Sequence, residues 1–262
     1  MKFEKLLSLL KEFSFASEAS ITQDNGRILY NFILDKKPLE CLELGFAHGI
    51  SSCYIAAALD EVGTGHLSSV DLIRAAEWQK PSIEELLFKT GLQEYVTVAR
   101  ENTSYTWFLK KKIEENSSSS QCQPIYDFCF IDGAKHWTID GLAFFLVDKL
   151  LKEDGWILFD DFKWIRDIIS KKGHNSLDYI SFLEMGEDEL NTPHIELIFR
   201  LLVMQHPNYS EFKIQDDWWA WAHKISSPEK TLVIDQSLTY RTYLVRAFRK
   251  LKRFASRIKP KT

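Results

Sequence analysis

Short apolar segments alternate with helical patterns between Leu39 and about Arg200, and this alternation constrains the fold more than any other feature of the sequence. The predicted strands cover residues 39–44, 66–70, 95–99, 126–131 and 156–159, with two later strands at 211–214 and 218–225. Helical patterns occupy residues 50–59, 81–90, 103–113 and 139–151 between them. Strands that alternate with helices at this spacing pair in parallel and are covered by helices on both faces. We therefore predict an α/β fold with a doubly wound, mostly parallel, seven-stranded sheet.

The chain divides into three parts around this sheet. Residues 1–37 contain two amphipathic patterns, at about 3–13 and 24–34, and form a predicted N-terminal helical segment. Residues 38–235 form the main domain, in which the polar stretch 163–192 is an insertion or lid at the ligand-facing end of the sheet. Residues 236–262 are a basic tail with nine Lys or Arg and no Asp or Glu.

The net charge of -4 therefore combines an acidic body with a basic tail. A general nucleic-acid binder presents a basic face, so nucleic acid is not a predicted partner. Within the tail, one face of a helical pattern carries Leu244, Phe248, Leu251 and Phe254. Such a helix can lie on an anionic membrane, or it can dock on the acidic body or on a second subunit. We favour docking over peripheral membrane contact, and a homodimer stays open.

The cysteines predict a reducing compartment. Cys41, Cys53, Cys122 and Cys129 form no C-x-x-C pair, and three of them lie in apolar runs, as buried reduced thiols do. The first residues lack the apolar stretch of a signal peptide. No run approaches the ~20 apolar residues that a membrane-spanning helix needs. We therefore expect a cytoplasmic protein.

Several apolar and histidine side chains predict packing rather than chemistry. The helix at 139–151 is expected to turn inward Leu142, Phe145, Leu146 and Leu150. The cluster at 218–221, which contains three tryptophans, is expected to pack in the core and against the sheet. Without ligand-like spacing, four histidines are interpreted as structural: His174, His194, His206 and His223.

Polar residues follow every predicted strand, at the edge where open α/β sheets bind their ligands. After the first strand, Gly45 and Gly49 let the backbone pass close to a ligand, and the next helix begins with free N–H groups. The loop lacks the G-x-G-x-x-G spacing of dinucleotide binders, and Glu43 would repel a diphosphate. Asp71, at the end of the second strand, can accept hydrogen bonds from both hydroxyls of a ribose. A plain glycine turn and a strand-terminating Asp are the alternatives, but together the two features favour a nucleoside ligand.

These residues carry a family resemblance. Glu43-x-Gly45-x-x-x-Gly49 with Asp71 resembles the cofactor motifs of class I S-adenosylmethionine-dependent methyltransferases. The stretches 130–133 (FIDG) and 154–161 (DGWILFDD) resemble the O-methyltransferase branch that includes the catechol and caffeoyl-coenzyme A types. The resemblance covers about residues 20–165. It implies the Rossmann-like fold of that class, S-adenosylmethionine as cofactor, and methyl transfer to a small-molecule acceptor, with a hydroxyl oxygen as the favoured target.

The resemblance also implies which residues contact the cofactor: Glu43, Gly45, Phe46, Gly49, Ser51, Ser52, Asp71, Asn102, Thr103 and Asp132. The first loop would flank the methionine part, and Ser51 and Ser52 would reach its carboxylate. Asn102 and Thr103 would contact the adenine. The sulfonium would lie beside the Asp132 carboxylate. Phe46 and Trp137 are candidates for aromatic faces around that cation, although core packing explains most aromatic residues equally well.

Three acids after the fourth and fifth strands match metal ligands of the same branch. Asp132, Asp160 and Asp161 would hold Mg²⁺, a hard cation that prefers oxygen ligands, and the metal would lower the pKa of the acceptor hydroxyl. Metal use stays open, because the metal-dependent families place Asn where Asp161 stands and because Asp161 can also cap a helix. For the base, Lys135 matches a catalytic lysine whose pKa is expected to be depressed, and His136 is the rival.

Two other classes of function remain as alternatives. A nicotinamide-dependent oxidoreductase would have a similar doubly wound sheet, but the first loop lacks the third glycine and carries an acid. A non-catalytic protein with a retained methyltransferase fold would not need the acids at the strand ends. The sequence leaves open the acceptor and whether its methylated atom is oxygen or nitrogen.

Overall fold

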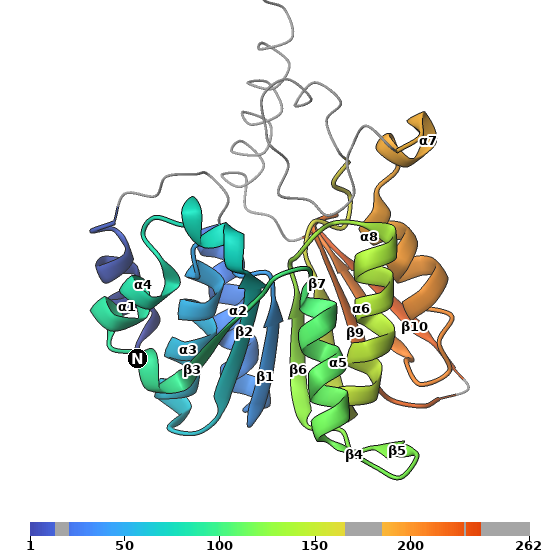
Figure 1. The fold of residues 1–262 in the computed structure, drawn as a ribbon, viewed down its shortest axis with the longest axis horizontal. Coiled ribbons are helices and arrows are strands. Elements are labelled where there is room, and N and C mark those ends of the chain that lie inside the picture. Colours follow the sequence, from blue (N-terminus) through green and yellow to red (C-terminus); the bar gives the residue numbers. More distant parts are fainter. Residues whose placement is uncertain (14–20, 166–184, 228, 237–262) are drawn as a thin grey trace, which may run out of the picture.

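A computed structural model of the chain describes residues 1–13, 21–165, 185–227 and 229–236 (Figure 1). Two predicted features lie largely or wholly outside these residues. Most of the 163–192 insertion is one of them, and the basic C-terminal helix is the other. No helix in the described ranges is both long and apolar enough to cross a membrane.

The core of the molecule is one eight-stranded sheet in the order β10-β8-β9-β7-β6-β1-β2-β3. The strands are β1 (Glu40–Leu44), β2 (His66–Leu72), β3 (Val96–Glu101), β6 (Tyr126–Ile131), β7 (Leu151–Phe159), β8 (Glu211–Gln215), β9 (Trp219–His223) and β10 (Thr231–Asp235). Only β9 runs antiparallel to its neighbours β7 and β8. The predicted doubly wound, mostly parallel α/β fold is confirmed. The predicted number of seven strands is wrong by one, because β10 adds an edge strand beside β8.

Helices cover both faces of this sheet (Figure 1). One face packs against α1 (Phe3–Leu10), α2 (Gln23–Lys36), α3 (Ile50–Val62) and α4 (Ile83–Thr90). The other packs against α5 (Tyr105–Glu115), α6 (Trp137–Leu150), α8 (His194–Ile198) and a π-helical turn at Phe199–Val203. The described residues also contain short elements: the 3₁₀ turns Ile73–Glu77 and Gln93–Tyr95, the hairpin of β4 (Ser117–Ser118) and β5 (Gln121–Cys122), and α7 (Glu187–Leu190).

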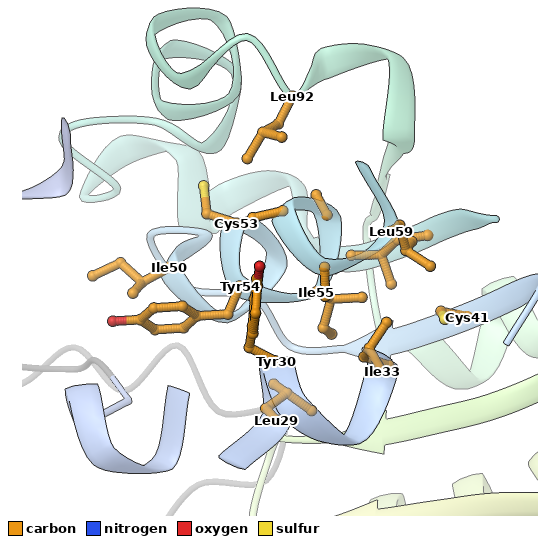
Figure 2. Packing of buried hydrophobic residues seen from close by; sticks show 14 of the residues in the cluster. Leu29, Tyr30, Ile33, Cys41, Ile50, Cys53, Tyr54, Ile55, Leu59 and Leu92 are labelled. Atoms are coloured by element: carbon orange, nitrogen blue, oxygen red, sulfur yellow. The ribbon is translucent and has the colours of Figure 1, made fainter. Parts of the chain in front are cut away.

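The contact between α2 and α3 shows how the sequence sets this packing. Leu29 and Ile33 of α2 point toward Ile55 of α3, and all three side chains are fully buried (Figure 2). A Cβ on Gly26 would lie 2.3 Å from the ring of Tyr54, so only glycine lets the two helices approach this closely. The N-terminal helical segment is therefore joined to the sheet domain through a shared core.

The structure also corrects two details of the predicted helices. Pro81 precedes α4, which begins after Ser82 with a capping box to Glu85. In α6 the inward face consists of Ala143, Phe144, Val147 and Leu150, whereas Leu142 and Phe145 are 51% and 44% exposed. The predicted inward positions of Leu142 and Phe145 are wrong. Both sides of α6 are apolar in sequence, so periodicity did not distinguish the face that packs.

Candidate functional site

The loop between β1 and α3 has a backbone that requires glycine. Gly45 and Gly49 have φ values of 89° and 87°, in the left-handed region. A Cβ on Gly45 would lie 2.6 Å from the carbonyl oxygen of Asp132, so the first loop presses directly against the end of β6. Gly49 stands at the N-cap of α3. The predicted close-approach loop thus brings the helix start and the Asp132 region together.

Glu43, the last-but-one residue of β1, is completely buried. Its Oε2 accepts hydrogen bonds from the hydroxyls of Ser52 and Ser69. Its Oε1 is buried and has no hydrogen-bond partner among the described residues. Burial raises the pKa of Glu43 to about 7, although the serine hydroxyls act in the opposite direction. A buried acceptor without a partner is costly, and a ligand donor would remove that cost.

Asp71 lies at the end of β2, directly beside the first loop. Its Oδ2 accepts from the backbone N–H of Ala47 at 2.9 Å and from the Gln79 amide at 3.0 Å. Its Oδ1 accepts from the N–H of Leu72 at 2.7 Å. Burial raises the pKa of Asp71, while these backbone bonds and the charge of Arg100 lower it. The carboxylate is therefore fixed in orientation at the position predicted for a ribose ligand.

Gln79 and Arg100 lie behind the Asp71 carboxylate and were not predicted from the sequence. The buried Gln79 accepts from Arg100 Nη1 at 2.8 Å. The guanidinium carbon of Arg100 lies 5.0 Å from the ring centroid of Phe46. Phe46, one of the predicted aromatic faces, therefore already contacts a cation. A charged residue at the end of β3 was the available signal, but the predicted strand stopped at Ala99.

The other predicted cofactor residues differ in exposure. Ser51 and Ser52 are buried in the first turn of α3, and the Ser52 hydroxyl is bonded to Glu43 rather than directed outward. Asn102 and Thr103 are exposed just after β3. The structure thus brings Ser51 and Ser52 to the first loop, and it places Asn102 and Thr103 at the same carboxyl edge of the sheet, on the far side of β2.

Asp132, Asp160 and Asp161 come together at the ends of β6 and β7. One oxygen from each lies within 4.8 Å of the others, so a single cation could be bound by all three. Lys135 reaches the same cluster: its Nζ bonds Asp132 and lies 3.5 Å from Asp161 Oδ2. Trp219 Nε1 donates to Asp160 Oδ1 at 2.7 Å. The predicted core role of the tryptophan cluster therefore includes holding one of the acids.

The charges in this cluster shift two pKa values. Burial by itself would lower the pKa of Lys135, but the charges of Asp132, Asp161 and Asp160 raise it above its ordinary value. Burial, together with the other two carboxylates, raises the pKa of Asp160. The prediction of a depressed pKa for Lys135 is therefore wrong, because three carboxylates surround its ammonium group and raise its pKa.

His136 has a structural role at the start of α6. It is the N-cap of α6, and its ring accepts from the N–H of Thr138 at 3.2 Å. The His194 ring centroid lies 5.5 Å from that of His136, and His194 Nδ1 accepts from the N–H of Trp137 at 3.1 Å. Of the two rival bases, Lys135 bonds Asp132 directly, whereas the His136 ring caps α6. His194 is structural, as predicted, and joins the start of α8 to the start of α6.

A buried pair that the sequence analysis missed holds this loop in place. The hydroxyl of Tyr105 bonds Asp140 and accepts from the N–H of Ala134 at 3.1 Å. Asp140 is fully buried and also accepts from the N–H of His136 at 2.6 Å. Lys135, between these two N–H groups, has a φ of 55°. The signal in the sequence was Asp140, an acid shortly before the apolar run 142–147.

The residues present fit the two groups that the resemblance implies. For the cofactor, the fit rests on the orphaned Oε1 of Glu43 and on the glycine loop that a Cβ would fill. For a divalent cation, the fit rests on three convergent carboxylates. Lys135 already neutralises part of their charge.

Comparison with known proteins finds a similarity in the central part of the chain. Residues 42–162 match a family model described as a methyltransferase domain. No curated protein matches the sequence.

Solved structures share the fold over most of the chain. The O-methyltransferase from Bacillus cereus in complex with SAH has 17% identity and a TM-score of 0.57, over 86% of this chain and 92% of that one. TomG from Streptomyces achromogenes, an O-methyltransferase in complex with SAM, has 15% identity and a TM-score of 0.54, over 86% and 89%. The SAH-bound methyltransferase PaMTH1 from Podospora anserina has 15% identity and a TM-score of 0.55, over 84% and 85%. At these identities, the likeness shows the fold.

Proposed function

We propose that this chain, whose residues 42–162 match a family model described as a methyltransferase domain, transfers a methyl group from S-adenosylmethionine to a hydroxyl oxygen of a small molecule. The observation that carries the proposal is the contact of Gly45 with the Asp132 carbonyl. That contact joins the glycine loop to the acid cluster, so a donor on one side would lie next to an acceptor on the other. In-line transfer depends on this kind of positioning.

The donor half of the site comprises Glu43, the 45–49 loop, Asp71 and the neighbouring residues Ser51, Ser52, Asn102 and Thr103. Glu43 Oε1 would accept from the amino group of the methionine part, and Asp71 would accept from the ribose hydroxyls. Asn102 and Thr103, exposed after β3, would contact the adenine. The relatives crystallised with SAM or SAH support this choice of cofactor.

The acceptor half comprises Asp132, Asp160, Asp161 and Lys135. The three carboxylates would hold Mg²⁺, which when bound lowers the pKa of an acceptor hydroxyl. Lys135 is the proposed base, because its Nζ bonds Asp132 and lies 3.5 Å from Asp161 Oδ2, and His136 stays the rival base. The carboxylates hold Lys135 as an ammonium, so it must release its proton to solvent before it takes one from the acceptor.

The remaining assignments follow from the same proposal. The 163–192 stretch would act as the lid that selects the acceptor, since it follows Asp161 at the ligand-facing edge of the sheet. The four cysteines are free thiols, which supports the cytoplasm as the location. The match of residues 42–162 to a methyltransferase domain model favours methyl transfer over the oxidoreductase alternative.

Calorimetric titration with S-adenosylhomocysteine tests the donor half without knowledge of the acceptor. We expect saturable binding with one site per chain. A folded sample that binds nothing at millimolar ligand would contradict the proposal. Transfer of labelled methyl groups from S-adenosylmethionine to a panel of hydroxyl and amine compounds, with and without EDTA, then tests the acceptor atom, the metal and the non-catalytic alternative.

A further inference from the structure

The outer edge of β10 is exposed and apolar. Leu232, Val233 and Ile234 are 40%, 56% and 62% exposed, although they are consecutive residues of a strand in the main sheet. The sheet ends at β10 in the part of the chain that the structure describes. An exposed apolar edge strand is a template for pairing with another strand.

The strand also lacks the features that usually protect such an edge. Residues 231–234 contain no charged residue and no proline, and β10 pairs with β8 in continuous register without a bulge. The charge of Asp235 is neutralised within the same sheet by Lys213 at 2.6 Å. At the opposite end of the sheet, the apolar side chains of β3 are buried or half-buried. The two edges of the sheet therefore differ: among the described residues, the apolar side chains of β10 are exposed and those of β3 are not.

The backbone of β10 identifies which groups are available. Thr231 N donates to Ser210 O, and Asp235 O accepts from Asp216 N, both at 2.7 Å. In a parallel pair, alternate residues direct both backbone groups to the same neighbour. Thr231, Val233 and Asp235 thus face β8, and the N–H and C=O groups of Leu232 and Ile234 face outward.

We propose that β10 pairs with β10 of a second copy of this chain, in antiparallel orientation about a two-fold axis through Val233. Leu232 then lies opposite Ile234 of the second copy. In this pair, the N–H of each residue donates to the C=O of the other, and the symmetric pair on the other side of the axis does the same. The segment T-L-V-I-D is nearly symmetric in its apolar character about Val233, so the same strand supplies both partners. This proposal gives an interface to the homodimer left open by the sequence and does not depend on the proposed function.

Packing on one face of the sheet supports the same pairing. Leu232 and Ile234 lie in register beside Phe212 and Ile214 of β8, which are buried in the core under α6 and α8. That core reaches the edge of the sheet without a covering element among the described residues. A second copy would place its own Leu232 and Ile234 beside the first pair and extend the apolar row.

The first test is the mass of the full chain in solution. Light scattering of purified protein at micromolar concentration should give twice the 30.6 kDa of one chain. Ile234→Lys should weaken the dimer at least about tenfold, because a lysine at the edge of a strand opposes pairing. Leu201→Lys is the matched control: Leu201 is 48% exposed on the π-helical turn, and its substitution should leave the dimer unchanged.

The second test locates the axis. In a Cys122→Ser background, whose three remaining cysteines are buried, Val233→Cys should form a disulfide-linked dimer under mild oxidation. Directly opposed residues without mutual hydrogen bonds have Cα atoms about 4.5 Å apart. Leu232→Cys should not crosslink, because its two copies would be about 8 Å apart.

Three results would overturn the proposal. One is a monomer at every concentration. Another is a dimer that Ile234→Lys does not weaken and Val233→Cys does not trap. The third is hydrogen-exchange protection of Leu232 and Ile234 that is independent of concentration, which would mean that another part of the same chain covers β10. Protection that rises with concentration is the expected result.

Discussion

The proposed donor and acceptor halves of the site are built by different means. In the donor half, backbone conformation and backbone hydrogen bonds set the geometry. Gly45 and Gly49 have positive φ, and Asp71 accepts hydrogen bonds from two backbone N–H groups. In the acceptor half, ion pairs between side chains set the geometry, and Lys135 lies between Asp132 and Asp161. A loop with positive φ accepts few residue types, whereas the side chains of a charge cluster can adopt a new arrangement after a single substitution. We therefore expect substitutions in the donor half to reduce stability and cofactor affinity more than those at the border of the acceptor half.

The largest effect is expected for Gly45→Val. Valine would combine a positive φ with a Cβ 2.6 Å from the Asp132 carbonyl, which costs roughly 1–3 kcal/mol for the backbone alone. Calorimetry should show no binding of S-adenosylhomocysteine, and Tm should fall by several degrees. Gly63→Ala is the control, because Gly63 also has a positive φ, of 83°, but nothing lies within 4 Å of its Cβ position. If both variants bind the ligand like the unmodified protein, the loop is an ordinary turn.

Glu43→Gln should change how stability depends on pH. The carboxyl has an ordinary pKa of 4.5 and a folded pKa of about 7. Between these values the folded state holds a proton that the unfolded state has lost, so the ligand-free protein loses stability as pH rises. The loss accumulates at up to about 1.4 kcal/mol per pH unit and is complete above the folded pKa.

Thermal unfolding of both proteins across this pH range measures the effect. The Tm advantage of Glu43→Gln should grow from pH 4.5 to 7 and then stay constant. The same variant should bind S-adenosylhomocysteine more weakly, because its amide no longer offers a carboxylate to the amino group. Parallel Tm curves for the two proteins would mean that the Glu43 carboxyl titrates normally.

Asp71→Ala should mainly reduce affinity for the cofactor. Hydrogen bonds to a charged group contribute about 1.5–3 kcal/mol, so affinity for S-adenosylhomocysteine should fall about 10- to 100-fold. Asp127→Ala is a matched control on the opposite edge of the sheet. Asp127 Oδ2 accepts from the N–H groups of Leu39 and Glu40 at 2.9 and 2.8 Å, so its loss should lower Tm without changing affinity. Equal loss of affinity in both variants would remove Asp71 from the proposed ribose contact.

The sequence predicted the backbone geometry of the glycine loop but not the side-chain partners around the site, for a physical reason. Glycines at fixed spacing and an acid after a strand report on local backbone geometry, which neighbouring residues determine. Gln79 was missed because its role depends on Arg100, which is distant in sequence and adjacent only through the pairing of β2 with β3. Tyr105 and Asp140 were missed for the same reason, since α5 and α6 bring them together.

The fold itself was predictable where the pattern of apolar residues fitted only one type of secondary structure. Alternating strands and helices gave the parallel sheet, and Gly91 was predicted to end α4, where it has a φ of 72°. The strand β10 was not predicted, because a short exposed edge strand carries no alternation of apolar and polar residues. Lys135 shows a further limit: the sequence placed it near the acids, but the direction of its pKa shift depends on how closely three carboxylates surround it.

His136→Ala should have the smallest effect and defines the border of the acceptor half. The His136 ring caps α6, and loss of an N-cap costs about 1 kcal/mol. Tm should therefore fall by a few degrees, whereas affinity for S-adenosylhomocysteine should stay unchanged. His136→Asn should restore most of the Tm, because asparagine is a strong N-cap and cannot act as a base near neutral pH. If His136→Asn keeps the Tm but abolishes methyl transfer to an identified acceptor, while Lys135→Met retains it, then His136 is the base and the assignment of Lys135 is wrong.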